Sequence, residues 1–275
     1  MQKLGQHFLK NTAILQKIVS ELALVDGDRI IEIGSGHGEL TVPLAHAARG
    51  KHCKIFCIEK DHTLIGGLEQ FAAQENSAIG DAGDDASVGS RVTIIEGDAL
   101  RLLPDMIATK IIGNIPYYIT GKLLRTVSEL KNKPERTVLL VQKEVADRIC
   151  ATPPDMNRLA ASVQFWADAE IVAHVSRKDF FPAPDVDSTI IVLNTKILHH
   201  ATHNLDPALY YRAVRAIFAQ PRKTLLNNLS AAARKTVQKN DIGEQIEKIG
   251  INPDARPQDL NIDQIAFIAR MGLWE

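Results

Sequence analysis

An amide side chain, a proline and two tyrosines follow one strongly apolar segment of the sequence. The segment is Ile111-Ile112-Gly113, and Asn114-Ile115-Pro116-Tyr117-Tyr118 follows it directly. The β-branched residues predict a buried strand that ends at Asn114, and Pro116 stiffens the next turn because its φ is fixed. The amide oxygen of Asn114 and the carbonyl oxygen of Ile115 or Pro116 can together accept both hydrogens of an exocyclic amino group. Tyr117 can then stack on the ring that carries this group, although the motif alone also fits a simple strand-to-loop turn.

A glycine-rich turn lies earlier in the chain. Gly34-Ser35-Gly36-His37-Gly38 follows an apolar strand predicted over 29–33 and precedes a helix predicted over 39–48. Glycines let the backbone approach a ligand closely, and the first turn of a helix offers free N–H groups. The spacing is G-x-G-x-G and not the full G-x-G-x-x-G dinucleotide fingerprint, so the turn predicts a nucleotide-type ligand without specifying which one.

Two carboxylates follow the next two predicted strands, 54–58 and 92–96. Glu59 comes about 20 residues after the glycine turn, the separation at which an acidic residue reaches ribose hydroxyls. Asp98 follows the third strand, where it can hold an adenine amino group. Because the carboxyl ends of parallel strands meet at one edge of a sheet, these residues are expected beside Asn114. The pattern therefore predicts an adenosine-containing cofactor next to a site for an amino group.

The elements that position these residues alternate between strand and helix. Strands are predicted over 29–33, 54–58, 92–96, 111–114 and 138–142, and helices over 11–24, 39–48, 61–74, 121–130, 144–149 and 157–165. Two more strands, 171–175 and 189–193, flank the loop 180–187 and give the sheet an antiparallel end. This alternation predicts a doubly wound, mostly parallel α/β sheet of seven strands, Rossmann-like in type. The small-residue-rich, acidic segment 76–90 is predicted to be a mobile surface loop.

Only helices are predicted after residue 195, over 207–219, 225–232, 241–249 and 262–271. The chain therefore divides into a cofactor-binding catalytic domain, 1–195, and a small all-helical C-terminal domain, 196–275. From Arg212 to Lys239 there are seven basic residues and no acidic one, so with a net charge of −1 overall the remainder carries −8. This contrast predicts a phosphate-binding face, with a solvated basic helix as the alternative.

The composition is that of an ordinary globular protein, 45% hydrophobic and 24% charged. No apolar run approaches the length of a membrane span, and the first residues carry no signal-peptide pattern, so a cytoplasmic location is predicted. The three cysteines are expected to be reduced thiols. His199, His200 and His203 lack partner ligands at metal spacing, so no metal site is predicted. Nothing in the sequence indicates an oligomer, and a monomer is expected.

Several short motifs occur together in one order along the chain. They are Gly5-Gln6-His7-Phe8-Leu9, Glu32-Ile33-Gly34-Ser35-Gly36, Gly97-Asp98-Ala99, Asn114-Ile115-Pro116-Tyr117, Gln142-Lys143-Glu144-Val145, Phe180-x-Pro-x-Pro-x-Val186-Asp187-Ser188 and Gln220-Pro221-Arg222-Lys223-Thr224-Leu225. In this combination the chain resembles the ribosomal RNA adenine N6-dimethyltransferases, and most closely the bacterial small-subunit enzymes of that family. The family usually has asparagine where this chain has His7.

The resemblance implies a methyltransferase that uses S-adenosylmethionine. It implies N6-dimethylation of two adjacent adenosines in the 3′-terminal hairpin loop of 16S rRNA, within the small ribosomal subunit or its precursor. The cofactor would be held by a set that spans the strand ends and the N-terminal motif: His7, Leu9, Gly34, Glu59, Asp98 and Asn114. Gly36 belongs to the same site through the glycine turn.

The target adenine must leave its stack, and Tyr117 and Phe180 are expected to sandwich it, with Phe181 as the alternative for the second face. Arg222 and Lys223, with Arg215, are assigned to RNA phosphates.

Other functions remain alternatives. A nicotinamide dehydrogenase shares the strand–glycine–acid pattern but leaves the segment 114–117 unexplained. A DNA adenine methyltransferase usually has Asn/Asp-Pro-Pro-Tyr, which differs from this chain at Ile115. A 23S rRNA adenine methyltransferase shares the fold and is the main alternative substrate class. The alternative from a different class is a small-subunit assembly factor whose binding matters more than its methylation.

Overall fold

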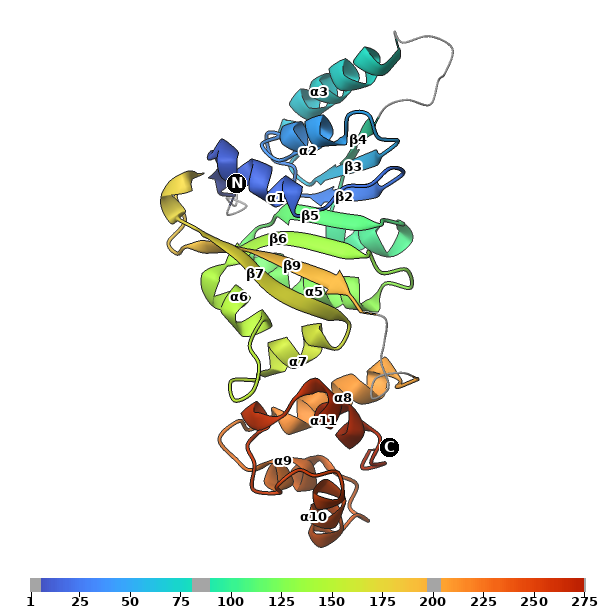
Figure 1. Ribbon diagram of the computed structural model, residues 1–275, viewed down its shortest axis with the longest axis vertical. Coiled ribbons are helices and arrows are strands. Elements are labelled where there is room, and N and C mark those ends of the chain that lie inside the picture. Colours follow the sequence, from blue (N-terminus) through green and yellow to red (C-terminus); the bar gives the residue numbers. More distant parts are fainter. Residues whose placement is uncertain (1–5, 81–89, 197–203, 275) are drawn as a thin grey trace. The chain divides into compact units, whose positions relative to one another are not determined.

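The computed structural model describes residues 6–80, 90–196 and 204–274. The chain forms two compact units (Figure 1). One comprises the chain up to Ala146 together with Glu170–Thr195, and the other comprises Asp147–Ala169 together with the chain from Lys196 onward. The sequence-based division assigned residues 147–169 to the first domain, whereas their contacts place them with the C-terminal helices.

The first unit is built on a seven-stranded sheet with the order β4-β3-β2-β5-β6-β9-β7. Its strands are β2 (Arg29–Ile33), β3 (Lys54–Glu59), β4 (Arg91–Glu96), β5 (Lys110–Asn114), β6 (Arg136–Gln142), β7 (Ala167–Val175) and β9 (Ser188–Thr195). The first five strands in this order pair in parallel, and β9 pairs antiparallel with β6. The predicted fold class is therefore confirmed. The strand order reverses between β2 and β5, which is where open α/β sheets bind their ligands.

Helices cover both faces of this sheet (Figure 1). They are α1 (Thr12–Ser20), α2 (Thr41–Ala48), α3 (His62–Gly80), α4 (Ala99–Leu102), α5 (Thr120–Glu129) and α6 (Lys143–Ile149). Ile18 of α1 and Leu44 of α2 share one core cluster with Ile30, Ile55 and Leu140 of the strands, and all five are fully buried. Because both faces are covered, the central strands are almost uniformly apolar.

Two helix ends differ from the prediction by four residues or more. Helix α1 begins after the predicted N-cap, Asn11, whose side chain accepts from two backbone N–H groups, but it ends at Ser20 because the chain turns at Ala23, where φ is +49°. Helix α3 continues to Gly80, so residues 76–80 are not loop. The Asn76 amide donates to the Val92 carbonyl and accepts from the Val92 N–H, both at 2.9 Å. This pair supplies partners to the edge strand β4 and holds the helix against it. The rest of the predicted loop, 81–89, lies outside the described residues.

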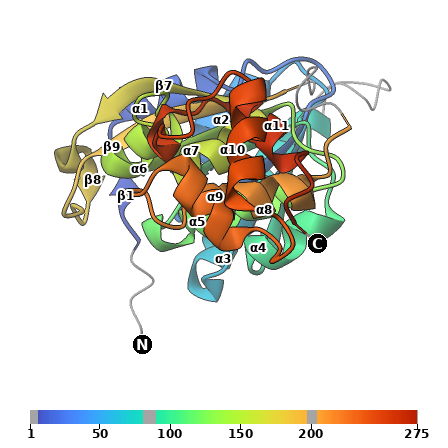
Figure 2. The ribbon, with the colours of Figure 1, turned by 90° about the horizontal axis from the view of Figure 1, so that it is seen from below.

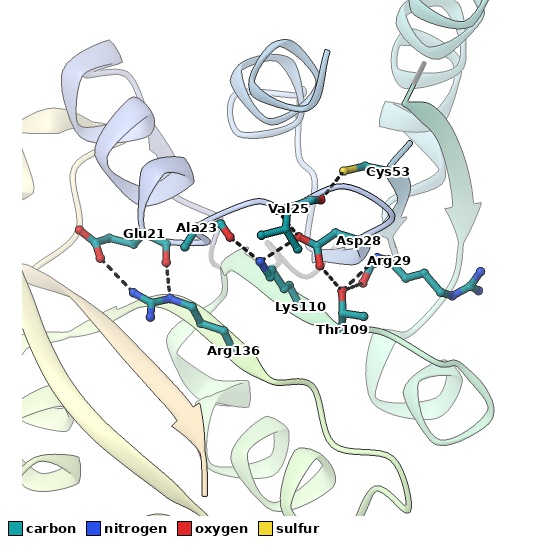
Figure 3. Close-up of polar contacts among 9 residues, drawn as sticks. All are labelled: Glu21, Ala23, Val25, Asp28, Arg29, Cys53, Thr109, Lys110 and Arg136. Carbon is teal, nitrogen blue, oxygen red and sulfur yellow. Dashed lines mark hydrogen bonds and ion pairs between the residues drawn. The ribbon is translucent and has the colours of Figure 1, made fainter. Parts of the chain in front are cut away.

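The amino ends of the central strands carry a closed polar network (Figure 3). Lys110 Nζ forms an ion pair with Asp28 Oδ2 at 2.8 Å, and both side chains are at least 95% buried. Asp28 also accepts from the Thr109 hydroxyl at 2.7 Å and from the Val25 N–H at 2.8 Å, while Lys110 donates to the Ala23 carbonyl. Burial opposes ionisation of Asp28, yet Lys110 and these donors hold its pKa below the ordinary value. The network ties the α1–β2 connection to the sheet.

The second unit is helical and has its own core. Its helices are α7 (Arg158–Gln164), α8 (Pro207–Ile217), α9 (Leu225–Ala232), α10 (Lys239–Lys248) and α11 (Ile262–Ala269) (Figure 2). Tyr210 is fully buried and stacks on Phe165 with ring centroids 4.0 Å apart. Among the described parts of the chain, no helix is long and apolar enough to cross a membrane. Those parts also contain no group of three or more metal-ligating side chains, and His199, His200 and His203 lie outside them.

Candidate active site

A cavity of about 230 Å³ lies in the first unit at the carboxyl ends of β2, β3 and β5. Most of the predicted cofactor and catalytic residues line it: His7, Gly34, Gly36, Glu59, Asp98, Asn114, Ile115, Pro116 and Tyr117. Leu9 and Phe180 do not line it, because their side chains are buried in the core at 0% and 5% exposure. The structure therefore brings together residues that were predicted from four separate strand ends.

The glycine turn between β2 and α2 needs its glycines for two reasons. Gly34, Gly36 and Gly38 have φ values of +73°, +59° and +92°, which side-chain-bearing residues rarely adopt. A Cβ on Gly36 would lie 3.1 Å from the Phe8 ring, so a larger residue would also collide with the N-terminal segment. The turn thus presents bare backbone to the cavity.

The Glu59 carboxylate organises this turn as well as facing the cavity. Its Oε2 accepts from the Gly36 N–H, and its Oε1 accepts from the N–H groups of Lys60 and Asp61, all at 2.8 Å. Three backbone donors around one buried carboxylate fix the ends of β2 and β3 relative to each other. The residue expected to contact ribose is therefore held rigidly before any ligand arrives.

Asp98 caps α4 by accepting from the Leu100 N–H at 3.0 Å, and it pairs with Lys60 Nζ at 3.1 Å. Burial favours its neutral form, but the Lys60 ammonium and the Leu100 donor outweigh that effect and lower the pKa of Asp98. The carboxylate is therefore ionised at neutral pH. Lys60 and Leu100 also line the cavity, and neither was identified from the sequence.

Asn114 is oriented by the N-terminal segment. Its Nδ2 donates to the His7 carbonyl at 3.0 Å, and because a carbonyl only accepts, this bond leaves Oδ1 as the free acceptor. The Pro116 carbonyl accepts from the Ile119 N–H at 3.1 Å, so the Ile115 carbonyl is the freer of the two backbone acceptors considered from the sequence. A Cβ on Gly113 would lie 2.9 Å from the Ile33 carbonyl, so β5 can approach β2 closely only with glycine there.

Tyr117 begins a short 3₁₀ turn (Tyr117–Ile119) and borders the cavity with its ring. Its hydroxyl hydrogen-bonds to the Ser188 hydroxyl at 2.7 Å, which fixes one end of the side chain. Burial raises the pKa of Tyr117, so the phenol stays protonated. The His7 ring lies near-parallel to it, with centroids 6.1 Å apart and an interplanar angle of 23°.

A two-stranded antiparallel sheet connects the N-terminal segment to the Phe-Phe-Pro loop. Strand β1 (Phe8–Leu9) pairs with β8 (Phe180–Phe181), and the Lys10 N–H donates to the Asp179 carbonyl at 2.8 Å. His7 Nδ1 donates to the Pro182 carbonyl at 2.9 Å. Within this loop Phe180 packs in the core, whereas Phe181 is 72% exposed. No strand was predicted at either place, because two-residue strands leave no periodic signal.

A buried acid lies beneath the glycine turn. Glu32 is 1% exposed, and its Oε2 accepts from the Thr41 hydroxyl at 2.7 Å. Its Oε1 and the hydroxyl of Ser35, which lines the cavity, have no hydrogen-bond partner among the described residues. Burial raises the pKa of Glu32 to about 7. Glu32 opens the motif Glu32-Ile33-Gly34-Ser35-Gly36, but no role was assigned to its side chain from the sequence.

The predicted RNA-binding residues lie in the helical unit. Arg215 is exposed on α8, and Arg222 and Lys223 are exposed in the turn between α8 and α9. The buried Asn228 amide holds this turn by accepting from the Gln220 N–H and donating to the Gln220 carbonyl, both at 3.0 Å. The two cations of the turn are therefore presented on a rigid support.

Comparisons with known proteins identify the family of the chain. The family model for ribosomal RNA adenine dimethylase matches residues 1–271. A ribosomal RNA small subunit methyltransferase A from Clostridioides difficile is 33% identical, covering 98% of this chain and 90% of that protein. One from Synechococcus elongatus is 36% identical, covering 96% and 91%.

Two solved structures share the fold. A dimethyladenosine transferase from Plasmodium falciparum matches with a TM-score of 0.75 and 24% identity over 95% of this chain and 96% of that one. The 23S rRNA methyltransferase ErmE matches with a TM-score of 0.68 and 20% identity over 95% and 98%. With a family model matched along nearly its whole length, and relatives above 30% identity over almost all of it, the chain belongs to the ribosomal RNA adenine dimethylase family.

Proposed function

We propose that the protein transfers methyl groups from S-adenosylmethionine to N6 of two adjacent adenosines in the 3′-terminal hairpin loop of 16S rRNA during small-subunit assembly. The observation that carries this proposal is the Asn114 amide, held with Nδ2 on the His7 carbonyl and Oδ1 free at the cavity. The small-subunit substrate is supported by the names of relatives that are 33% and 36% identical over nearly the whole chain.

The chemistry of the cavity fits S-adenosylmethionine, which supplies a methyl group on a sulfonium when it is bound. Bare backbone at Gly34 and Gly36 suits close approach by the ligand, and Glu59 and Asp98 offer acceptors for ribose hydroxyls and for an adenine amino group. His7 lines the same cavity. Leu9 is fully buried, so in this proposal it contributes only through the backbone of β1.

Asn114 and the Ile115 carbonyl activate the target nitrogen. Oδ1 of Asn114 and the carbonyl oxygen accept the two N6 hydrogens, which draws the nitrogen lone pair out of conjugation with the ring. With the methyl donor bound, this lone pair would lie in line with the methyl–sulfur bond, so that the N–C bond would form as the C–S bond breaks and the sulfur would leave as an uncharged thioether. Positioning then supplies most of the rate enhancement. N6 becomes cationic on methylation and its proton becomes acidic, so water is a sufficient acceptor. The second transfer repeats these steps on the monomethylated base with one N6 hydrogen left to bond.

The target adenine is flipped out of its stack and lies against the Tyr117 ring. The Tyr117–Ser188 hydrogen bond supports this role because it holds the ring in place. Phe180 remains the residue assigned from the sequence to the second face. The exposure of Phe181 at 72%, against 5% for Phe180, supports the alternative, since only an exposed ring reaches a base without rearrangement of the core.

The helical C-terminal domain contacts RNA in this proposal. Arg222 and Lys223 on their fixed turn, and Arg215 on α8, bind backbone phosphates. Such contacts give affinity and salt dependence and do not select sequence, so the choice of adenosine comes from RNA shape and from the splayed bases.

The test is methyl transfer from labelled S-adenosylmethionine to small subunits that lack the modification, with 23S rRNA alongside and the modified nucleoside identified by mass. The proposal predicts N6-dimethyladenosine on the small subunit only. Label on 23S rRNA would instead support the large-subunit alternative. Tight binding of cofactor and subunits without transfer would contradict the enzymatic proposal and favour an assembly factor.

A further inference from the structure

A second hollow, of about 760 Å³, lies in the helical unit. Arg222 and Lys223, the two cations of the turn assigned to RNA phosphates, are not part of its lining. Its walls come from α8, from the segment after α9 and from the C-terminal end of the described chain. Four of its lining residues are basic: Arg212, Arg215, Arg234 and Lys235. Here these four residues and their surroundings are called the basic hollow. From the sequence, all four belong to the basic stretch 212–239 predicted as a phosphate-binding face, and Arg215 alone among them was assigned individually to RNA phosphates.

The walls of the basic hollow are held in place. Arg212 and Arg215 are three residues apart on α8 and so share one face of that helix. On the opposite wall, the Arg234 N–H donates to the Leu273 carbonyl at 3.0 Å, and the Arg234 guanidinium donates to the Gly272 carbonyl at 2.5 Å. Trp274 is 8% exposed and also lines the hollow. The segment that carries Arg234 and the helix that carries Arg212 and Arg215 are therefore both held by the fold.

The positive charge in the basic hollow is not neutralised within the unit. No carboxylate lines it, and across the described ranges Arg212, Arg215 and Lys235 form no ion pair. Like charges brought this close repel one another and cost folding free energy. A polyanion that enters the hollow would offset that repulsion.

The lining also indicates which part of a polyanion fits. Apart from the four cations, the lining consists mainly of alanine side chains. These small side chains leave room for the sugar–phosphate backbone of a polyanion. Trp274 is buried and its Nε1 donates to the Ala269 carbonyl, so no exposed ring is offered for base stacking. Apart from the Trp274 indole, Thr236 is the sole uncharged side chain in the described lining that can form hydrogen bonds. The hollow therefore offers few groups that could recognise the edges of bases. The lining therefore suits phosphates and sugars and not bases.

We propose that the basic hollow binds the sugar–phosphate backbone of the RNA substrate, independently of sequence, as a contact separate from the Arg222–Lys223 turn. This inference rests on the proposed function in one respect, since it takes RNA as the substrate. It adds a second anchoring point on the helical unit, and it gives Arg212, Arg234 and Lys235, predicted from the sequence only as part of the basic stretch 212–239, a contact of their own.

The experiment measures the affinity of the whole protein for two RNAs as a function of salt. One RNA is the 16S-derived hairpin and the other is a length-matched RNA of scrambled sequence. Lys235→Ala is expected to weaken binding to both by the same factor, about three- to tenfold, and to reduce the slope of log K against log salt by about 1. Arg212→Ala with Lys235→Ala should reduce the slope by about 2.

Lys248→Ala is the matched control, because Lys248 is an exposed lysine of the same unit at the end of α10, outside the basic hollow. It should leave the slope unchanged, and Lys235→Arg should restore most of the wild-type slope. The effects of Lys235→Ala and of Arg222→Ala with Lys223→Ala should add in log K, as expected for separate contacts.

An unchanged slope in Lys235→Ala, or a loss confined to the 16S hairpin, would overturn the inference. Methyl transfer by the wild-type protein is measured in parallel. Failure of that transfer would count against the proposed function alone, because the salt slopes still report whether the hollow binds RNA.

Discussion

The two edges of the parallel sheet use polar residues in opposite ways. At the amino edge, Lys110 and Asp28 are buried together, and both oxygens of Asp28 accept hydrogen bonds (Figure 3). At the carboxyl edge, Asn114 has its donor bonded and its acceptor left free beside a cavity. Both edges are built by the same strands, so topology alone does not separate scaffold from site. The distinction lies in which hydrogen-bonding groups are already occupied.

Buried polar residues therefore have two different roles in this fold. A network whose members satisfy each other holds elements together, and removing one member leaves an unpaired buried charge. A polar group that is oriented on one side and open on the other is prepared for a ligand. The comparison therefore predicts loss of stability at one edge and loss of activity at the other.

The largest effect on stability is expected at the amino edge. Lys110→Met leaves the Asp28 carboxylate buried without its partner and should lower the free energy of unfolding by about 3–5 kcal/mol. Denaturant unfolding measures this change. Lys54→Met is the matched control. Lys54 and Lys110 are the first residues of β3 and β5, but Lys54 is exposed and Lys110 is buried. Lys54→Met should change the free energy of unfolding by less than about 0.5 kcal/mol. Equal shifts in the two variants would contradict the assignment of the network to stability.

The next effect concerns the buried acid under the glycine turn. Because burial raises the pKa of Glu32 to about 7, the folded state keeps a proton that the unfolded state loses near pH 4.5. Stability should therefore fall as pH rises from about 4.5 through 7, by about 3 kcal/mol in total. Glu32→Gln removes this contribution and should gain stability over the wild type as pH rises.

Urea unfolding at pH 5, 6.5 and 8 tests the behaviour of Glu32. Glu96→Gln is the control, because Glu96 is an exposed acid at the end of β4. A difference between Glu32→Gln and the wild type that stays constant across this pH range would show that Glu32 does not retain a proton in the folded state.

A smaller effect is expected from the ring at the carboxyl edge. Tyr117→Ala should reduce kcat/KM for RNA by roughly 10- to 100-fold, since base–aromatic stacking is worth about 1–3 kcal/mol. Tyr117→Phe keeps the ring but loses the bond to Ser188, so it should cost less. Comparing Phe181→Ala with Phe180→Ala decides which ring covers the second face of the target adenine. Substitution of the stacking residue should lower kcat/KM without changing the free energy of unfolding, whereas substitution of a core residue should destabilise the fold. A Tyr117→Ala enzyme with normal kcat/KM would remove Tyr117 from the base site.

The sequence allowed the sheet and the strand-end residues to be predicted because both depend on local patterns. Apolar runs such as that before Asn114 define strands, and parallel pairing then gathers their carboxyl ends. Features that depend on contacts between distant segments were not predictable. The β1–β8 pair consists of two residues on each side, and the end of α3 depends on the bond between Asn76 and Val92.

The orientation of the Asn114 amide shows the same limit within the site. Its identity and position follow from the sequence, but its free acceptor depends on the His7 carbonyl, which belongs to a segment 107 residues earlier in the chain. The choice between the Ile115 and Pro116 carbonyls likewise required the Ile119 contact. Spacing along the chain predicts which residues gather, and the hydrogen bonds they form determine what each can still accept.

The central claim is that the free Asn114 acceptor drives methyl transfer. Its most direct test is the single-turnover rate of Asn114→Ala with saturating S-adenosylmethionine and unmodified small subunits, with cofactor binding and unfolding measured on the same protein. We expect the rate to fall by about 10²- to 10³-fold while the protein remains folded and cofactor-bound, because one preorganised polar contact to the reacting group is lost. A near-normal rate with cofactor bound would contradict the account.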